Sequence, residues 1–173
     1  MAILFQYGSN CSETQINSPD RLCGDAIFVD IAETVHDYRI TFDVFSRKRG
    51  CAAADIIPSP GHKVWGVLYE VPDWLVDRKS AKKRNRKSLD AIEGEGTNYR
   101  RIDTDVRRPG GQLIKAVTYV VIDPKPGLQT SLEYVSHIVV GLRDRGVDVA
   151  YIDTVKSIAA QNNPGICADL RRL

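Results

Sequence analysis

AILFQYGSN, residues 2–10, is a short apolar run that ends in a turn. The run predicts a buried strand, because its side chains are almost all apolar until Gly8, Ser9 and Asn10 begin the turn. A turn of this kind can point successive backbone N–H groups outward and bind an anion or a developing oxyanion. An ordinary connecting turn has the same composition, so these residues alone leave both interpretations open.

The middle of the chain contains further strand candidates. Residues 38–44 alternate apolar and polar side chains, and residues 64–71 are similar, which is typical of strands with one buried face. Residues 99–106 and 114–122 complete the set, and turns that contain Pro-Gly or Gly-Gly separate the candidates.

Helices are predicted in two parts of the chain. One covers about residues 73–93, where Asp73 can cap the start and Gly94 follows the end. The other part is the C-terminal third, with one helix from a capping box at 130–133 and a second over about 148–161. Because strands and helices do not alternate strictly, the pattern predicts an α+β fold with a barrel-like sheet rather than a doubly wound one.

Composition limits the class of protein. A length of 173 residues suits a single domain, 1–173. The 24 Lys and Arg barely outnumber the 22 Asp and Glu, so no global field attracts nucleic acid. The four cysteines are scattered singly, which predicts reduced thiols and a cytoplasmic protein. No apolar run approaches the roughly 20 residues that span a bilayer, so no membrane segment or signal peptide is expected.

Glu93 is the candidate for acid–base chemistry. At helical spacing it shares a face with Leu89 and Ile92, so its carboxylate is expected to point inward. Burial, the negative end of the helix and the charge of Asp90 would each raise its pKa, as a general base near neutral pH requires. A glutamate that faces water in a frayed last turn would have the same local sequence, and the pattern does not exclude it.

Three segments together resemble the γ-glutamylcyclotransferase family: FQYGSN at 5–10, SPGHKVWGVLY at 59–69, and LDAIEG at 89–94 followed by Tyr99. The C-terminal part, 119–142, is also similar to the closing region of that family, so the resemblance covers nearly the whole chain. It implies a small mixed β-barrel flanked by helices, with an active site between the first turn and the glutamate.

The resemblance also implies the roles of individual residues. Glu93 corresponds to the catalytic acid/base of the family. The first turn corresponds to a loop whose main chain holds the glutamyl α-carboxylate or the carbonyl oxygen, and two tyrosines correspond to residues near the substrate. The implied substrate-binding residues are Tyr7, Gly8, Ser9, Asn10, Tyr99 and Tyr119.

The reaction that the resemblance implies is the release of 5-oxoproline and a free amine or amino acid from a small-molecule γ-glutamyl substrate. Ring closure is intramolecular, because the nucleophile is the substrate's own α-amine. One carboxylate and a few N–H donors can move the proton and stabilise the oxyanion. No cofactor and no metal site are therefore expected, and His36, His62 and His137 form no ligand pair in the sequence.

Two features depart from the family pattern. Cys11 stands where the loop usually continues with leucine, which we expect to alter packing rather than catalysis. RKSAKKRNRK, residues 78–87, contains seven basic residues where many relatives are shorter and less charged. It can be a solvated helix face, a lid that attracts an anionic substrate, or a weak polynucleotide patch, although no interleaved aromatics support the last.

A second function therefore stays open beside the enzyme: a non-catalytic binding module of the same fold that uses residues 78–87 to hold an anionic ligand or nucleic acid. An edge strand or an exposed Trp74 could also support a homodimer.

Overall fold

The computed structural model describes residues 1–173 and has a closed five-stranded β-barrel at its centre. The strands follow the order β1 (Ala2–Gln6), β5 (Trp65–Val71), β2 (Ile27–Thr34), β6 (Tyr99–Arg107) and β7 (Leu113–Val121). Neighbouring strands are antiparallel except where β1 meets β7, which pairs in parallel through Leu4 and Val117 and closes the barrel. The predicted mixed barrel of an α+β fold is confirmed.

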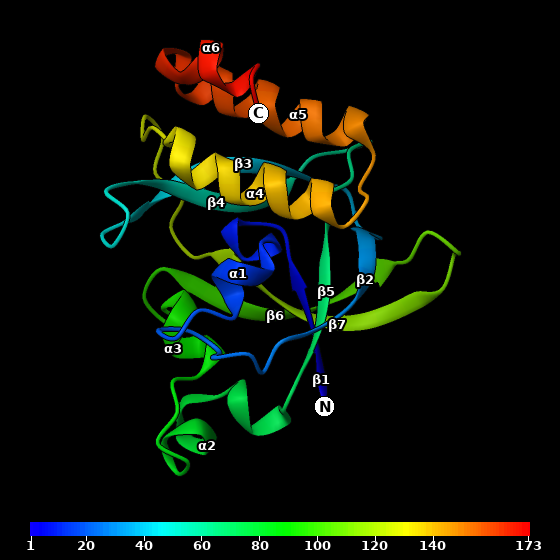
Figure 1. The fold of residues 1–173 in the computed structure, drawn as a ribbon, viewed down its shortest axis with the longest axis vertical. Coiled ribbons are helices and arrows are strands. Elements are labelled where there is room, and N and C mark those ends of the chain that lie inside the picture. Colours follow the sequence, from blue (N-terminus) through cyan, green and yellow to red (C-terminus); the bar gives the residue numbers. More distant parts are fainter.

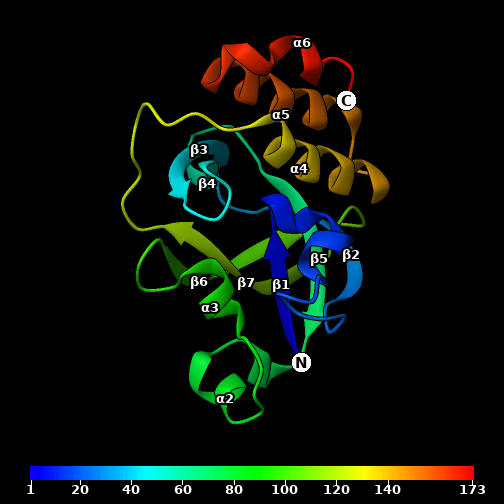
Figure 2. The same ribbon diagram turned by 60° about the vertical axis from the view of Figure 1, so that its left-hand side comes forward.

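A second layer covers one side of the barrel (Figures 1 and 2). Strands β3 (Tyr38–Ser46) and β4 (Cys51–Pro58) form a separate two-stranded sheet beside helix α4 (Leu132–Asp144), and helix α5 (Val149–Asn162) packs against both β3 and α4. The chain ends in a 3₁₀ turn, Pro164–Ile166, and the short helix α6 (Cys167–Leu170). No helix of the chain combines the length and the apolar character needed to cross a bilayer.

Helix α4 packs directly against the turn that follows β1. This turn is a 3₁₀ turn, Ser9–Cys11, and the short helix α1 (Glu13–Ile16) comes after it. A Cβ atom added to Gly141 of α4 would lie 2.3 Å from the carbonyl carbon of Cys11 and 2.4 Å from the backbone nitrogen of Ser12. The absence of a side chain at Gly141 therefore sets how closely the helix approaches the turn.

The segment between β5 and β6 is not the single helix predicted over residues 73–93. It forms a 3₁₀ turn, Asp73–Leu75, and two short helices, α2 (Arg78–Lys82) and α3 (Leu89–Glu93). Asn85 interrupts the segment with a φ of 53°, a left-handed conformation that does not continue a right-handed helix. Each helix has its own N-cap: the Asp77 side chain accepts from Ser80 N–H, and the Ser88 side chain accepts from Ala91 N–H.

Candidate active site

The turn after β1 lies inside the protein rather than on its surface. Ser9 and Asn10 are buried, and the backbone N–H of Cys11 donates to the carbonyl oxygen of Gly8 at 2.9 Å. A Cβ atom added to Gly8 would lie 3.2 Å from the hydroxyl oxygen of Tyr134, so α4 closes over the turn. The buried Cys11 thiol donates to the carbonyl oxygen of Gln6 at 3.1 Å, in keeping with the packing role expected for it.

Glu93 lies beside this turn. It is the last residue of α3, and Gly94 ends the helix in the left-handed conformation with a φ of 68°. The side-chain amide of Asn10 donates to Oε1 of Glu93 at 2.7 Å. Asn10 Oδ1 is buried and has no hydrogen-bond partner. A carboxylate and an unpaired acceptor therefore stand next to each other at the centre of the site.

The surroundings of Glu93 favour its protonated form. Burial raises the pKa of its carboxyl above the ordinary value, while the nearby Arg21 and the hydrogen bond from Asn10 act in the opposite direction. A carboxyl in such an environment can accept a proton and return it more readily near neutral pH than an exposed glutamate can.

A cavity of about 260 Å³ brings the predicted site residues together. Its walls come from β1, the turn after β1, α3, the ends of the β3–β4 sheet and the barrel strands β6 and β7. Every residue predicted for the site lines this cavity: Tyr7, Gly8, Ser9, Asn10, Glu93, Tyr99 and Tyr119.

The tyrosine hydroxyls at the cavity are bound to the protein itself. Tyr7 donates to the backbone carbonyl of Tyr119, and Tyr99 donates to the carbonyl oxygen of Ala54 at 2.9 Å. Tyr134 accepts from the backbone N–H of Ala54 at 2.9 Å. Burial raises the pKa of all three hydroxyls, so they remain protonated and their rings form fixed walls.

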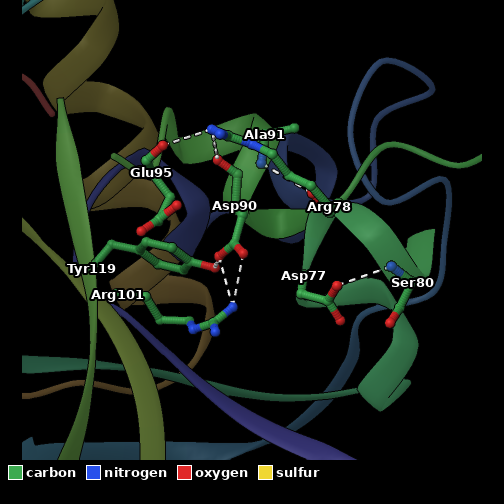
Figure 3. A network of polar contacts seen from close by, with 9 residues as sticks. Asp77, Arg78, Ser80, Asp90, Ala91, Glu95, Arg101 and Tyr119 are labelled. Carbon is green, nitrogen blue, oxygen red and sulfur yellow. Dashed lines mark hydrogen bonds and ion pairs between the residues drawn. The ribbon is translucent and has the colours of Figure 1, made fainter. Parts of the chain in front are cut away.

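Tyr119 is held by a network of polar contacts around Asp90, which lies on the same helix, α3, as Glu93 (Figure 3). Its hydroxyl donates to Oδ1 of Asp90 at 2.9 Å, and Nη1 of Arg101 contacts both carboxylate oxygens of Asp90 at 2.9 and 2.8 Å. Arg78 donates to the carbonyl oxygens of Asp90 and Glu95 at 3.0 and 2.7 Å. These bonds attach α3 to β6, β7 and the start of α2, and thereby fix the position of Glu93.

The basic segment 78–87 does not reach the cavity. None of its residues is among those that line the cavity, so the interpretation as a lid finds no support. Arg84 and Arg86 stack on the half-buried ring of Trp74, with guanidinium carbons 5.0 and 5.9 Å from its centroid. Arg86 also pairs with Asp25. The segment is a separate lobe whose basic side chains partly bind the chain itself.

Sequence reasoning missed several residues of the cavity. Tyr134 is one of them. It lies in the first turn of α4, and this position is the only local signal that could have indicated it. The N-cap of α4 is Ser131 rather than the Thr130 of the predicted capping box. Arg21 and the residues 47–49 belong to loops and carry no such signal.

Comparisons of the sequence with a family model and with known proteins indicate the same family. A family model described as γ-glutamyl cyclotransferase, AIG2-like, matches residues 4–136. The γ-glutamylcyclotransferase of Mus musculus is 26% identical over 172 residues, covering 96% of this chain and 84% of the mouse protein. That of Homo sapiens is 26% identical over 168 residues, covering 94% and 81%.

Solved structures agree with the fold. A structure titled γ-glutamyl cyclotransferase superposes with a TM-score of 0.75 at 23% identity, covering 91% of this chain and 87% of the other. A crystal structure of an uncharacterized protein from Homo sapiens gives a TM-score of 0.76 at 25% identity with the same coverage.

Proposed function

The chain belongs to the AIG2-like γ-glutamyl cyclotransferase family, and from this premise we propose that it releases 5-oxoproline and a free amine or amino acid from a small γ-glutamyl compound. Glu93 is the acid/base in this proposal. The observation that carries it is the 2.7 Å hydrogen bond from Asn10 to Glu93, which joins the turn and the carboxylate at one partly buried point.

Two protons leave the substrate's α-nitrogen and two reach the departing nitrogen, with Glu93 as the carrier. The α-ammonium first gives a proton to the carboxylate, and the freed amine attacks the γ-carbonyl carbon. A C–N bond forms in the five-membered ring, and the original γ-amide C–N bond breaks as the departing nitrogen takes this proton from Glu93. The second proton of the α-nitrogen follows the same route, so the products are a neutral lactam and an ammonium. No water is consumed. The unpaired Asn10 Oδ1 is suited to accept a hydrogen bond from the ammonium before the proton moves.

The turn and the tyrosine rings supply binding in this scheme. Gly8, Ser9 and Asn10 line the same cavity as Glu93, and backbone N–H groups of such a turn are suited to bind the glutamyl carboxylate or the developing oxyanion. Tyr7 and Tyr99 would bound the glutamyl chain, while Tyr119 contributes its ring and holds Asp90 through its hydroxyl.

Mass spectrometry in H₂¹⁸O tests the proposal. A panel of γ-glutamyl amines and amino acids is incubated with the protein, and the products are analysed. Cyclisation yields 5-oxoproline and amine in equal amounts without ¹⁸O, whereas hydrolysis yields glutamate labelled with ¹⁸O. The proposal fails if no compound gives 5-oxoproline, or if labelled glutamate is the first product.

The pH dependence of kcat/KM should follow the ionisation of Glu93. Burial raises its pKa, and only the ionised form can accept the ammonium proton, so kcat/KM should rise as the pH increases through this raised pKa. The folded state favours the protonated carboxyl of Glu93. The contribution of this group to the free energy of unfolding should therefore decline as the pH rises over the same range. An acid limb at the pKa of an ordinary exposed glutamate would contradict the assignment.

Replacement of Asp90 should lower kcat although Asp90 does not face the substrate. Asp90→Asn removes the charge that holds Arg101 and weakens the bond to Tyr119, so α3 loses its fixed position. We expect a loss of about 1–3 kcal/mol of stability and a fall in kcat of up to about 100-fold from misplacement of Glu93. Kinetics and urea unfolding measure the two effects.

Asp103→Asn is the matched control for this change. Asp103 lies on β6, two residues after Arg101, but it is exposed and forms no ion pair. The positioning role of Asp90 is wrong if Asp90→Asn and Asp103→Asn have the same kcat. The pH profile should keep its shape in Asp90→Asn, because Glu93 remains the titrating group.

The cellular setting is proposed on simpler grounds. All four cysteines are free thiols, which supports a reducing compartment such as the cytoplasm. A homodimer stays a prediction. The binding module that would use residues 78–87 has no observation in its favour, because Arg78, Arg86 and Lys87 donate hydrogen bonds to the chain itself.

A further inference from the structure

The cavity that contains Glu93 has an excess of positive charge. Four cationic side chains line it, and Glu93 is the only acidic side chain that does. Arg21 belongs to the loop after α1, and Arg47, Lys48 and Arg49 belong to the turn that joins β3 to β4. This turn projects from the β3–β4 sheet and is far from α3 in the sequence (Figures 1 and 2).

Three of these cations have no carboxylate partner in the protein. Lys48 pairs with Asp20, but no ion pair contains Arg21, Arg47 or Arg49. The guanidinium of Arg49 lies over the ring of Tyr134, 5.4 Å from its centroid. The cation on the aromatic ring is thereby held at the wall of the cavity.

Arg21 gives a more specific signal. Its Nε atom is buried and has no hydrogen-bond partner. A buried, unpaired donor on a charged group costs free energy, which an anionic ligand in the cavity would remove. Arg21 is near enough to act on the Glu93 carboxyl electrostatically, yet the two form no ion pair. Both residues line the cavity.

A second hollow adjoins the cavity and shares Lys48, Arg49 and Tyr134 with it. His137 of α4 lines its wall together with the acidic Asp20 and Glu133, so this hollow has no excess of positive charge. Burial lowers the pKa of His137, and the charges of Arg49 and Arg21 lower it further, whereas Glu133 acts in the opposite direction. The groups that favour an anionic far end of the substrate are therefore Arg21, Arg47 and Arg49 of the first cavity and not the second hollow.

Charge balance indicates how many negative groups this far end carries. With Lys48 paired to Asp20, three guanidinium groups line the cavity and Glu93 contributes at most one negative charge, which leaves two or more positive charges in excess. A γ-glutamyl derivative of a neutral amino acid has one net negative charge at pH 7, because its two carboxylates face one ammonium. A γ-glutamyl derivative of an acidic amino acid has two, which matches the cavity.

We propose that Arg21, Arg47 and Arg49 form a binding site for a dicarboxylic leaving group, so that the preferred substrates are γ-glutamyl derivatives of acidic amino acids. This inference rests on the proposed function, because it specifies the leaving half of the same reaction. The cations bind and orient the far end of the substrate and take no part in proton transfer.

The test compares γ-glutamylglutamate with γ-glutamylglutamine, which have nearly the same shape and differ by one negative charge. The wild-type kcat/KM for γ-glutamylglutamate is expected to be about 10- to 100-fold higher, the value of one charge-assisted hydrogen bond. Arg47→Gln and Arg49→Gln should each reduce this ratio, and added salt should reduce it in the wild type. Lys83→Gln, an exposed substitution outside the cavity, should leave the ratio unchanged.

Two results would contradict the proposed binding site for the leaving group. One is equal kcat/KM for the two dipeptides in the wild type, in which case the cyclotransferase activity stands and only the leaving-group site is wrong. The other is a preference that Arg47→Gln and Arg49→Gln both leave intact.

A binding measurement separates this proposal from the proposed function. If neither dipeptide gives 5-oxoproline, calorimetry on Glu93→Gln still compares their dissociation constants without chemistry. Tighter binding of γ-glutamylglutamate supports the anion site, and equal binding overturns it.

Discussion

Glu93→Gln is expected to lower kcat for 5-oxoproline release by about 10²- to 10⁴-fold, the usual contribution of a positioned acid/base. Glutamine keeps the size of the side chain, and its oxygen can still accept the hydrogen bond from Asn10. It cannot take the proton from the substrate's ammonium. The fold should remain intact, because the change removes a buried charge instead of introducing one.

Glu95→Gln is the control for this variant. Glu95 follows two residues later in the chain, but its side chain does not line the cavity, and only its backbone groups form hydrogen bonds, with Asp90 and Arg78. Single-turnover kinetics with a cleaved substrate would compare the two variants with the wild type. A Glu93→Gln enzyme with undiminished 5-oxoproline production would remove Glu93 from the mechanism.

Gly141→Ala should cause the second large effect, a loss of stability. The new Cβ atom would lie 2.3 Å from the carbonyl carbon of Cys11 and 2.6 Å from its oxygen. These are backbone atoms and cannot rotate away, so α4 and the turn must separate. Overpacking of this kind costs about 1–3 kcal/mol or more, which exceeds the gain of up to about 1 kcal/mol from replacing glycine within a helix.

The same displacement should also reduce activity, because the turn that moves contains Asn10. Urea unfolding and kcat measure the two effects. Gly110→Ala is the matched control: the chemical change is identical, but nothing lies within 4 Å of its added Cβ atom. Equal denaturation midpoints for the two variants would mean that α4 and the turn can adjust without cost.

The sequence predicted the strands that have a clear periodicity and missed the two that lack it. Five predicted strands agree with β1, β3, β5, β6 and β7 within a few residues. A bulge between Phe28 and Asp30 breaks the alternation of β2. In β4 the residues 51–56 are all buried and include three consecutive alanines, so the strand shows neither alternation nor β-branched residues at its start.

The basic segment shows how local signals compete. The cap candidate Asp73 and the stop at Gly94 predicted one helix over 73–93, and signals at the two ends cannot detect a single left-handed residue at Asn85. The two N-caps, Asp77 and Ser88, are ordinary cap residues and could have divided the segment correctly.

The sequence predicted the site residues that belong to its motifs, but it could not predict those that loops bring to the cavity. The nearness of Glu93 to the first turn agrees with the expectation, whereas their chemical roles stay predictions. Tyr99 and Tyr119 lie at the cavity, but the sequence could not indicate that Ala54 and Asp90 hold their hydroxyls. The arginines of the loops reach the cavity only through tertiary structure.

The parallel contact between Leu4 of β1 and Val117 of β7 has a consequence for biosynthesis. The first strand leaves the ribosome long before its final neighbour exists. At about 5–20 residues per second, residue 121 follows residue 6 after roughly 6–23 s. During this interval β1 lacks one of its two neighbouring strands and has an unpaired edge, so aggregation or chaperone capture is most to be expected before translation passes β7.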